Sequence, residues 1–237
     1  MRAIVISDIH GNIDALRRLE REWGPTFQGF DRLVCLGDLV DYGPDPKDVI
    51  EWVRARATDI VRGNHDYAMA TGEPCRSAPA YLEASMLTRQ CLRPTLTNDD
   101  LAYLGDLPDR RTLTLGEVTW HLVHATPASP LHDYVAPDAA NGQWISALGG
   151  LRGQHVLIGH THLAFARSLA GGMLINPGSL GMPKDGHPHG SYAVVQDQAV
   201  QFRRIVYDPE PMLRRLRRLN LPEHVFEQLA RTFRTGS

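Results

Sequence analysis

Five short segments of the sequence carry most of the side chains that could bind a metal ion or transfer a proton. They are rich in histidine and aspartate, and the chain has 11 histidines in all. These segments offer imidazole nitrogens and carboxylate or amide oxygens but no thiolate, which suits Mn, Fe, Zn, Co or Ni. An ordinary magnesium site has fewer nitrogen ligands. The segments are Asp8-Ile9-His10, Gly37-Asp38-Leu39-Val40-Asp41, Gly63-Asn64-His65-Asp66, His124 and Gly159-His160-Thr161-His162.

Two of these segments place possible ligands two residues apart. In an extended chain, side chains at this spacing point to the same side. His160 and His162 can therefore reach a common centre, and so can Asp8 and His10. The pair of histidines is the strongest single signal of a metal site in the chain.

Each segment also has a plainer interpretation. Asp8 could cap the helix that follows it, and Asp38 could be a turn residue after a glycine. His124 could be a buried structural histidine, which is what we expect of its neighbour His121. The occurrence of five such segments in one chain nevertheless favours a single shared site.

Each of the five segments directly follows a run of residues that we expect to form a β-strand. These runs are residues 3–6, 33–36, 59–61, 118–123 and 156–158. In an open α/β sheet the carboxyl ends of the strands share one edge, where the loops form the ligand crevice. The sequence therefore predicts that segments far apart in the chain converge there.

The rest of the chain predicts a single α/β domain over residues 1–237. Asn12 is expected to cap a helix, and Asp45 with Pro46 provides an N-cap and a first-turn proline for a second helix. Residues 67–107 are expected to be helical, and two more helices begin at Pro209 and Pro222. Further strands are predicted at residues 112–115, 173–175, 192–195 and 200–206. The first three strands alternate with helices, which indicates a parallel sheet covered on its faces, whereas short spacings between strands in the second half suggest hairpins.

Composition excludes several classes of protein. The 237 residues include 25 lysines and arginines against 27 aspartates and glutamates, so the chain has no overall basic field that would favour nucleic acid. Three cysteines without ligand spacing indicate a reducing compartment. There is no apolar run of membrane length and no signal-peptide core. We expect a cytoplasmic protein that does not associate with membranes.

The five segments resemble those of the calcineurin-like metallophosphoesterases, in particular the small bacterial phosphoesterase and phosphodiesterase branch. The matching motifs are DIH, GDLVD, GNHD, the single His124 and GHTH, in the family's order. Asn176-Pro177-Gly178-Ser179 resembles a further segment of that branch, so the likeness covers most of the chain. The resemblance implies a four-layered α/β/β/α sandwich of two mixed sheets flanked by helices.

The resemblance also implies a site for two divalent metal ions. One ligand set would be Asp8, His10, Asp38 and His162, and the other would be Asp38, Asn64, His124 and His160. We expect Mn, with Fe, Zn, Co or Ni as alternatives. Two such ions, two aspartates and a bridging hydroxide leave one net positive charge, which attracts a phosphate ester anion. The neutral amide of Asn64 preserves this charge, whereas an aspartate there would cancel it.

Further roles follow from the same resemblance. His65 would be the general acid that protonates the departing oxygen, and Asp41 would orient it. Asp66 is expected to be structural. Asn12, Tyr42 and Arg62 are candidate substrate contacts. Tyr42 replaces an arginine of the protein serine/threonine phosphatases in the superfamily, which argues against a phosphoprotein substrate.

The function implied is the hydrolysis of phosphomonoester or phosphodiester bonds of a small, plausibly nucleotide-type substrate, as in phosphodiesterases or dinucleoside-polyphosphate hydrolases. A DNA-processing nuclease of the superfamily and a non-catalytic interaction scaffold are the alternatives, and nucleic-acid binding stays open. The helical segment 67–107 either packs on the sheet or acts as a lid. Lys184, in a loop after the Asn176-Pro177-Gly178-Ser179 segment, either borders the site or is exposed. The sequence leaves the oligomeric state undetermined.

Overall fold

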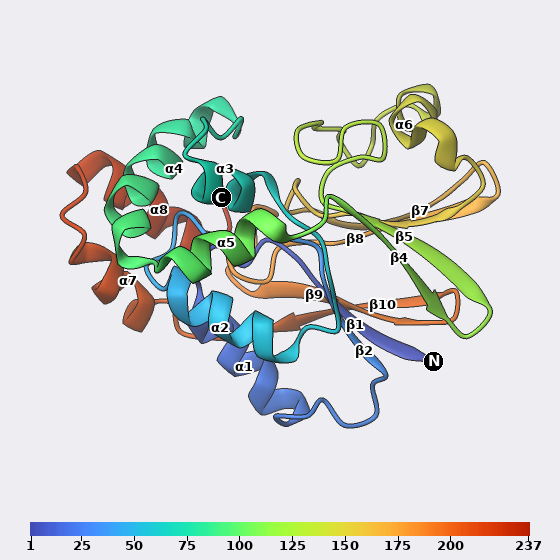
Figure 1. Cartoon of the computed structure of the whole chain (residues 1–237), viewed down its shortest axis with the longest axis horizontal. Helices are drawn as coiled ribbons and strands as arrows, with labels where there is room; N and C mark the ends of the chain where they lie inside the picture. Colours follow the sequence, from blue (N-terminus) through green and yellow to red (C-terminus); the bar gives the residue numbers. More distant parts are fainter.

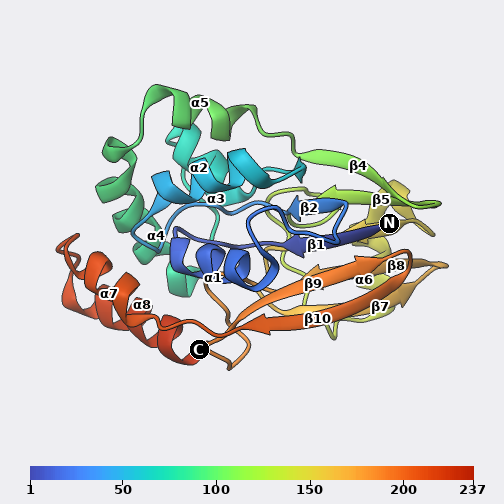
Figure 2. The ribbon, with the colours of Figure 1, turned by 90° about the horizontal axis from the view of Figure 1, so that it is seen from below.

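The computed structural model describes all residues, 1–237. Two five-stranded sheets pack face to face, and helices cover the outer face of each (Figure 1, Figure 2). The strand orders are β10-β9-β1-β2-β3 and β4-β5-β6-β8-β7. This arrangement confirms the four-layered sandwich of two mixed sheets.

Both sheets combine parallel central strands with antiparallel ones. In the first sheet the strands are β1 (Arg2–Ile6), β2 (Arg32–Cys35), β3 (Asp59–Ile60), β9 (Gly190–Gln196) and β10 (Ala199–Ile205). In the second they are β4 (Arg110–Leu115), β5 (Val118–Val123), β6 (His155–Leu157), β7 (Ala164–Leu169) and β8 (Gly172–Pro177). Pairing is parallel along β1-β2-β3 and along β5-β6-β8, and all other neighbours are antiparallel.

The helices gather on the outer faces of the sheets and at one end of the sandwich. They are α1 (Ile13–Trp23), α2 (Pro46–Arg56), α3 (Asn64–Thr71), α4 (Pro79–Leu92), α5 (Asn98–Asp106), α6 (Asn141–Leu148), α7 (Glu210–Arg217) and α8 (Glu223–Thr235). Figure 1 shows α1 and α2 on one side of the paired sheets and α6 on the other. None of these helices has both the length and the apolar character needed to cross a bilayer.

Strand β1 is buried on both faces, as its continuous apolar run predicts. Ala3 and Val5 pack between the two sheets against Trp120 of β5. Ile4 and Ile6 point the other way and join the core under α1 and α2. This two-residue alternation fixes the register of β1 and therefore the position of the loop that follows it.

Two elements, β7 and α6, have no counterpart among the sequence-based predictions. β7 lies at an edge of its sheet, and most of its residues are only partly buried, so it lacks a strong apolar pattern. α6 has eight residues and no side-chain cap, although Trp144 anchors it to the outer face of the second sheet. Both depend on tertiary packing more than on local sequence.

The two predicted helix caps differ in outcome. The Asn12 Oδ1 atom accepts a hydrogen bond of 3.1 Å from the Ala15 amide and caps α1. Asp45 stands at the N-cap position of α2 but makes no side-chain cap bond. Its carboxylate instead pairs with the Arg215 guanidinium at 2.7 and 2.8 Å, because α7 folds back against this turn. Asp45 therefore occupies the predicted N-cap position with Pro46 in the first turn, but its carboxylate contributes to packing against α7 and not to the cap.

Candidate functional site

The seven predicted metal ligands meet at the edge of the sandwich where β1, β2, β5 and β6 end. None of their residues is more than 3% exposed. They are Asp8, His10, Asp38, Asn64, His124, His160 and His162. The packing of the two sheets thus brings together side chains that are spread from residue 8 to residue 162.

An unusual backbone conformation aims several of these side chains. Asp8, His10, Asp38, His160 and His162 all have positive φ angles, between 49° and 69°. Such angles are uncommon for residues other than glycine, and each costs on the order of 1–3 kcal/mol. A cost repeated at five positions in one site indicates that function, rather than stability, has selected the conformation.

The ligand atoms form two groups, and Asp38 of the second group also lies close to the first. Asp8, His10 and His162 form one group, and Asp38, His124 and His160 form the other, with all ligand atoms in each group within 4.8 Å of one another. The Asp38 Oδ2 atom lies 3.1 Å from the His124 Nε2 atom and 3.8 Å from the His10 Nε2 atom. The Asp38 carboxylate therefore lies between the two groups of ligand atoms.

Asn64 completes the second group. Its Oδ1 atom lies 3.1 Å from the Nε2 atom of His124, and the Nδ1 atom of His160 lies 3.1 Å from the same nitrogen. An amide oxygen, a carboxylate and two imidazoles therefore lie close enough together to bind the same ion.

Hydrogen bonds to backbone carbonyls fix the ring tautomers so that lone pairs face the site. The Nδ1 atom of His10 donates to the Val40 carbonyl at 2.9 Å, and that of His162 donates to the Met182 carbonyl at 2.5 Å. Burial lowers the pKa of both histidines well below its usual value, so they are neutral at neutral pH. Their two Nε2 atoms, both acceptors, lie only 3.2 Å apart.

Two acceptors at this distance repel each other unless a cation lies between them. The Oδ1 atom of Asp8 and the Nε2 atom of His160 are also buried without a hydrogen-bond partner. Burial raises the pKa of Asp8 to about 6, as expected of a carboxylate that lacks its counter-charge. The donor set and its orphaned atoms therefore fit divalent metal ions.

The whole-chain comparison agrees with this geometry. The model of the calcineurin-like phosphoesterase superfamily domain matches residues 1–199. The chain belongs to this superfamily. It is a metal-dependent hydrolase of phosphoric ester bonds, from a superfamily that typically binds two divalent metals.

Relatives of this calcineurin-like phosphoesterase span nearly its whole length. A metallophosphoesterase from Sphaerobacter thermophilus is 30% identical, with 97% of this chain and 99% of that chain covered and a TM-score of 0.76. An uncharacterized protein of Methanocaldococcus jannaschii is 29% identical over 95% of this chain and 96% of its own length. A hypothetical protein of Pyrococcus horikoshii, 22% identical, shares the fold, with a TM-score of 0.83 over 100% and 98% of the two chains.

His65 lies beside the metal ligands and is tied to an acid. Its Nδ1 atom lies 2.6 Å from the Asp41 Oδ2 atom, and the Arg89 guanidinium of α4 binds the same carboxylate oxygen. Burial by itself would lower the pKa of His65, but the neighbouring Cys75 and Asp38 side chains and the hydrogen bond to Asp41 outweigh burial and raise it well above its usual value. The imidazole is therefore held protonated in a fixed orientation.

Cys75 and Arg89 contact this pair, although the sequence gives no sign of either role. The Cys75 Sγ atom accepts a hydrogen bond from the Asn64 Nδ2 atom at 3.0 Å and lies 3.5 Å from the His65 Nδ1 atom. Both residues lie in the helical segment 67–107, between 10 and 48 residues along the chain from their partners. No motif of short range could have identified them.

Two of the three candidate substrate contacts have their polar atoms engaged within the protein. The Asn12 amide donates to the Gly181 carbonyl at 2.8 Å in addition to capping α1. The Arg62 guanidinium binds Asp109 at 2.6 Å and the Gly105 carbonyl at 2.7 Å. These bonds argue against direct substrate contacts by Asn12 or Arg62, and neither enters the function proposed below.

Tyr42 does border the site, but it is 1% exposed. Its hydroxyl lies 3.4 Å from the His65 Nε2 atom, and its ring centre lies 4.8 Å from that of His10. A ring packed in this way has no free face for a nucleotide base. Tyr134, which is 49% exposed, places its ring centre 3.9 Å from that of His160 and forms part of the outer wall.

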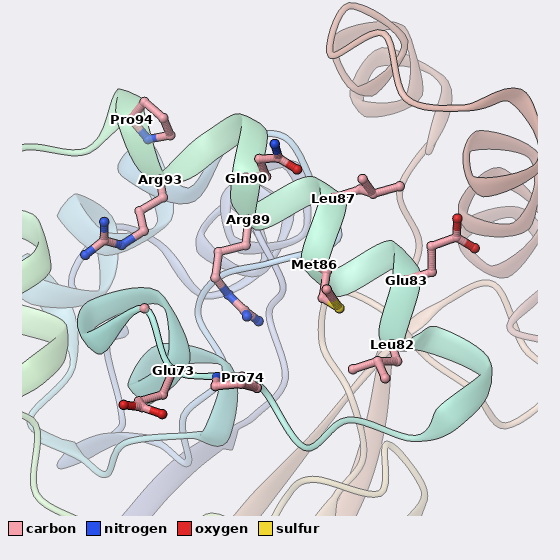
Figure 3. A pocket seen from close by; sticks show the side chains of 11 residues that line it. Glu73, Pro74, Leu82, Glu83, Met86, Leu87, Arg89, Gln90, Arg93 and Pro94 are labelled. Atoms are coloured by element: carbon pink, nitrogen blue, oxygen red, sulfur yellow. The ribbon is translucent and has the colours of Figure 1, made fainter.

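The structure also has a cavity of about 940 Å³ away from the metal ligands. It lies between α4 and the loop after α3. Apolar side chains such as Leu82 and charged ones such as Glu83 and Arg93 line it (Figure 3). Figure 3 shows Arg89 pointing from α4 toward the loop that carries Pro74. None of the seven metal ligands lines this cavity, so it is separate from the metal-binding site.

Asp66 has the structural role expected of it. Its carboxylate accepts hydrogen bonds from the amides of Asp38, Leu39 and Gly63, at 2.8, 2.8 and 2.9 Å. These bonds tie the loop after β2 to the start of α3. The bridging carboxylate and the general-acid candidate are thereby held in one rigid unit.

Close approach of the same two loops requires glycine at position 63. A Cβ atom there would lie 2.0 Å from Asp38 Oδ1 and 2.4 Å from the Asp38 amide nitrogen. We expect Gly63→Ala to lower the free energy of unfolding by about 1–3 kcal/mol and to weaken metal binding. Urea denaturation and elemental analysis measure the two effects. Gly142→Ala is the control, because Gly142 has no atom within 4 Å of its Cβ position; an equally stable Gly63→Ala protein would contradict the prediction.

Metal loading should stabilise the fold because the ligands are assembled only in the folded chain. With free Mn²⁺ at about 100 times its Kd, binding adds about 2.7 kcal/mol. This raises Tm by about 5–10 °C for a domain of this size, which differential scanning fluorimetry measures. His124→Ala should lose most of the shift, whereas His121→Ala, outside the site on β5, should retain it. A metal-independent Tm for the unmodified protein would contradict the assignment.

Proposed function

We propose that this protein hydrolyses a small phosphoester with two divalent transition-metal ions held by the seven buried ligands. Mn²⁺ is the first ion to be tested, with Fe, Zn, Co and Ni as alternatives. Oxygen and imidazole donors without a thiolate suit this set of metals as a whole. Asp8, His10, Asp38 and His162 would hold one ion. Asp38, Asn64, His124 and His160 would hold the other.

The observation that supports this proposal most directly is the pair of facing acceptors. His10 and His162 present unprotonated Nε2 atoms to each other across 3.2 Å, with both Nδ1 atoms already committed to carbonyls. Two histidines with a purely structural role would share a proton between their Nε2 atoms. Two histidines that bind the same metal ion instead direct both Nε2 lone pairs toward that ion.

The chemistry divides between the ions and the chain's own residues. When bound, two divalent ions lower the pKa of a shared water and polarise the phosphoryl oxygens. The burial of the ligands excludes bulk water and strengthens these electrostatic effects. Asn64 binds as a neutral donor and so keeps the centre cationic toward an anionic ester.

His65 supplies the proton for the departing oxygen. Asp41 accepts from its Nδ1–H, which leaves the Nε2 atom, 3.4 Å from the Tyr42 hydroxyl, to carry the proton that is transferred. Arg89 in turn fixes Asp41 and anchors α4 against the reaction centre. We propose that segment 67–107 acts mainly as a wall of the substrate pocket through Cys75, Tyr81 and Arg89.

Two measurements on the purified protein test the proposal. Elemental analysis should find close to two transition-metal ions per chain after loading. The loaded protein should then hydrolyse at least one of p-nitrophenyl phosphate, bis-p-nitrophenyl phosphate, a cyclic nucleotide or a dinucleoside polyphosphate. Protein that binds metal but turns over none of these with any candidate ion would instead support a non-catalytic interaction scaffold. Cleavage of DNA alone would favour a nuclease.

A further inference from the structure

Lys184 is an unusual cation in this protein. Of the 25 lysines and arginines in the chain, only Lys47 and Lys184 are lysines. Lys47 is exposed on α2, whereas Lys184 is partly buried in the loop between β8 and β9. That loop also provides Met182, whose carbonyl accepts the hydrogen bond from the metal ligand His162. Lys184 therefore extends from a segment that already forms part of the site.

The Lys184 ammonium group has no anionic partner. It forms no salt bridge or hydrogen bond in the structure, although Asp185 beside it pairs with Arg204. Its Nζ atom lies 4.1 Å from the centre of the Tyr81 ring and 5.5 Å from that of Tyr42. Aromatic faces stabilise a cation only in part. Buried charges in proteins are normally paired, and no side chain of this chain pairs with the Lys184 ammonium group.

The position of Lys184 indicates what that partner is. The Tyr42 ring beside it contacts both His10 and His65, with ring centres 4.8 and 4.9 Å apart. Burial lowers the pKa of Lys184 to about 8, while the carboxylates of Asp8 and Asp38 oppose this change. These two carboxylates favour the charged ammonium form of Lys184. It adds a positive charge one aromatic ring away from the reaction centre.

The net charge of the site, with and without Lys184, indicates which substrate the site prefers. This inference rests on the proposed function. Two divalent ions, Asp8, Asp38 and a hydroxide leave one net positive charge, which matches a phosphodiester monoanion. Lys184 raises the local charge by one, which matches a phosphomonoester dianion. We propose that Lys184 binds the non-bridging oxygens of the bound phosphoryl group and makes the site prefer phosphomonoesters over phosphodiesters.

Kinetics with two matched esters test the preference. Lys184→Ala should lower kcat/KM for p-nitrophenyl phosphate about 10- to 100-fold, as expected for loss of one hydrogen bond between charged groups. For bis-p-nitrophenyl phosphate the loss should be less than about threefold. Lys184→Arg should recover part of the monoester activity, and Lys47→Ala should resemble the unmodified protein with both esters. Equal losses with the two esters, or no loss with either, would overturn the assignment.

Chemical acetylation provides a second readout that does not depend on turnover. Acetic anhydride should modify both lysines of the Mn-loaded protein, and mass spectrometry can follow each separately. Added inorganic phosphate should protect Lys184 and leave Lys47 unchanged; failure to protect Lys184 would contradict phosphate binding by its ammonium group. If the loaded unmodified protein hydrolyses neither ester, the proposed function itself fails. If it hydrolyses either and the Lys184 results do not follow, only the present inference fails.

Discussion

Asp38→Asn should abolish the dinuclear centre and lower phosphoesterase activity by about 10³-fold or more. A metal centre contributes several kcal/mol of charge stabilisation to the transition state, and about 4 kcal/mol corresponds to 10³ in rate. The asparagine can keep the hydrogen bond that Asp38 Oδ1 accepts from the His65 amide at 2.9 Å. Its Nδ2 group would face the His124 Nε2 atom, 3.1 Å from the present Oδ2 position, and donate to it. The substitution therefore replaces the ligand by a donor that blocks the cation while it preserves the loop.

Metal content by elemental analysis and kcat/KM on an activated ester measure these effects in parallel. Asp59→Asn is the matched control, since Asp59 is a buried carboxylate of the same sheet that pairs with Arg111 at 2.9 Å, outside the site. The control should keep both metal and activity. An Asp38→Asn protein with two ions per chain and near-normal turnover would exclude Asp38 as the bridge.

His65→Ala should slow the hydrolysis of an alkyl phosphoester by about 10²- to 10⁴-fold, the usual contribution of a general acid. An alkoxide needs a proton as it departs, and His65 is the imidazole held by Asp41 at 2.6 Å. The loss on a p-nitrophenyl ester should be much smaller, because p-nitrophenolate leaves without protonation. Steady-state kinetics with the two leaving groups measure the difference directly.

Two further variants sharpen the interpretation. Asp41→Asn should show the same dependence on the leaving group at reduced size, because Asp41 acts through His65. His121→Ala, which removes a histidine on β5 outside the site, should behave like the unmodified protein. Equal losses of the His65→Ala protein on alkyl and p-nitrophenyl esters would remove His65 from the acid role.

The sequence by itself determined the superfamily, and through that resemblance it predicted the sandwich fold and the set of metal ligands. The residue patterns alone predicted that segments at the carboxyl ends of strands gather at one edge. Strand runs such as Ala3–Ile6 are fixed by local apolar pattern, and each predicted ligand segment follows a strand or opens a helix. Once the strands are placed, their carboxyl ends set the position of Asp8, Asp38 and His124. A short-range pattern is therefore enough to predict a long-range cluster.

Which side chains surround that cluster could be learned only from the tertiary structure. Asn12 and Arg62 look available in the sequence, but other segments of the chain occupy their polar atoms. Cys75, Arg89 and Lys184 carry no motif, and they approach the site because the loop after α3, helix α4 and the loop after β8 fold over it. The spacing of ligands within a segment follows from local backbone geometry. The walls of the pocket depend on packing between residues far apart in the sequence, and no local sequence pattern predicts that packing.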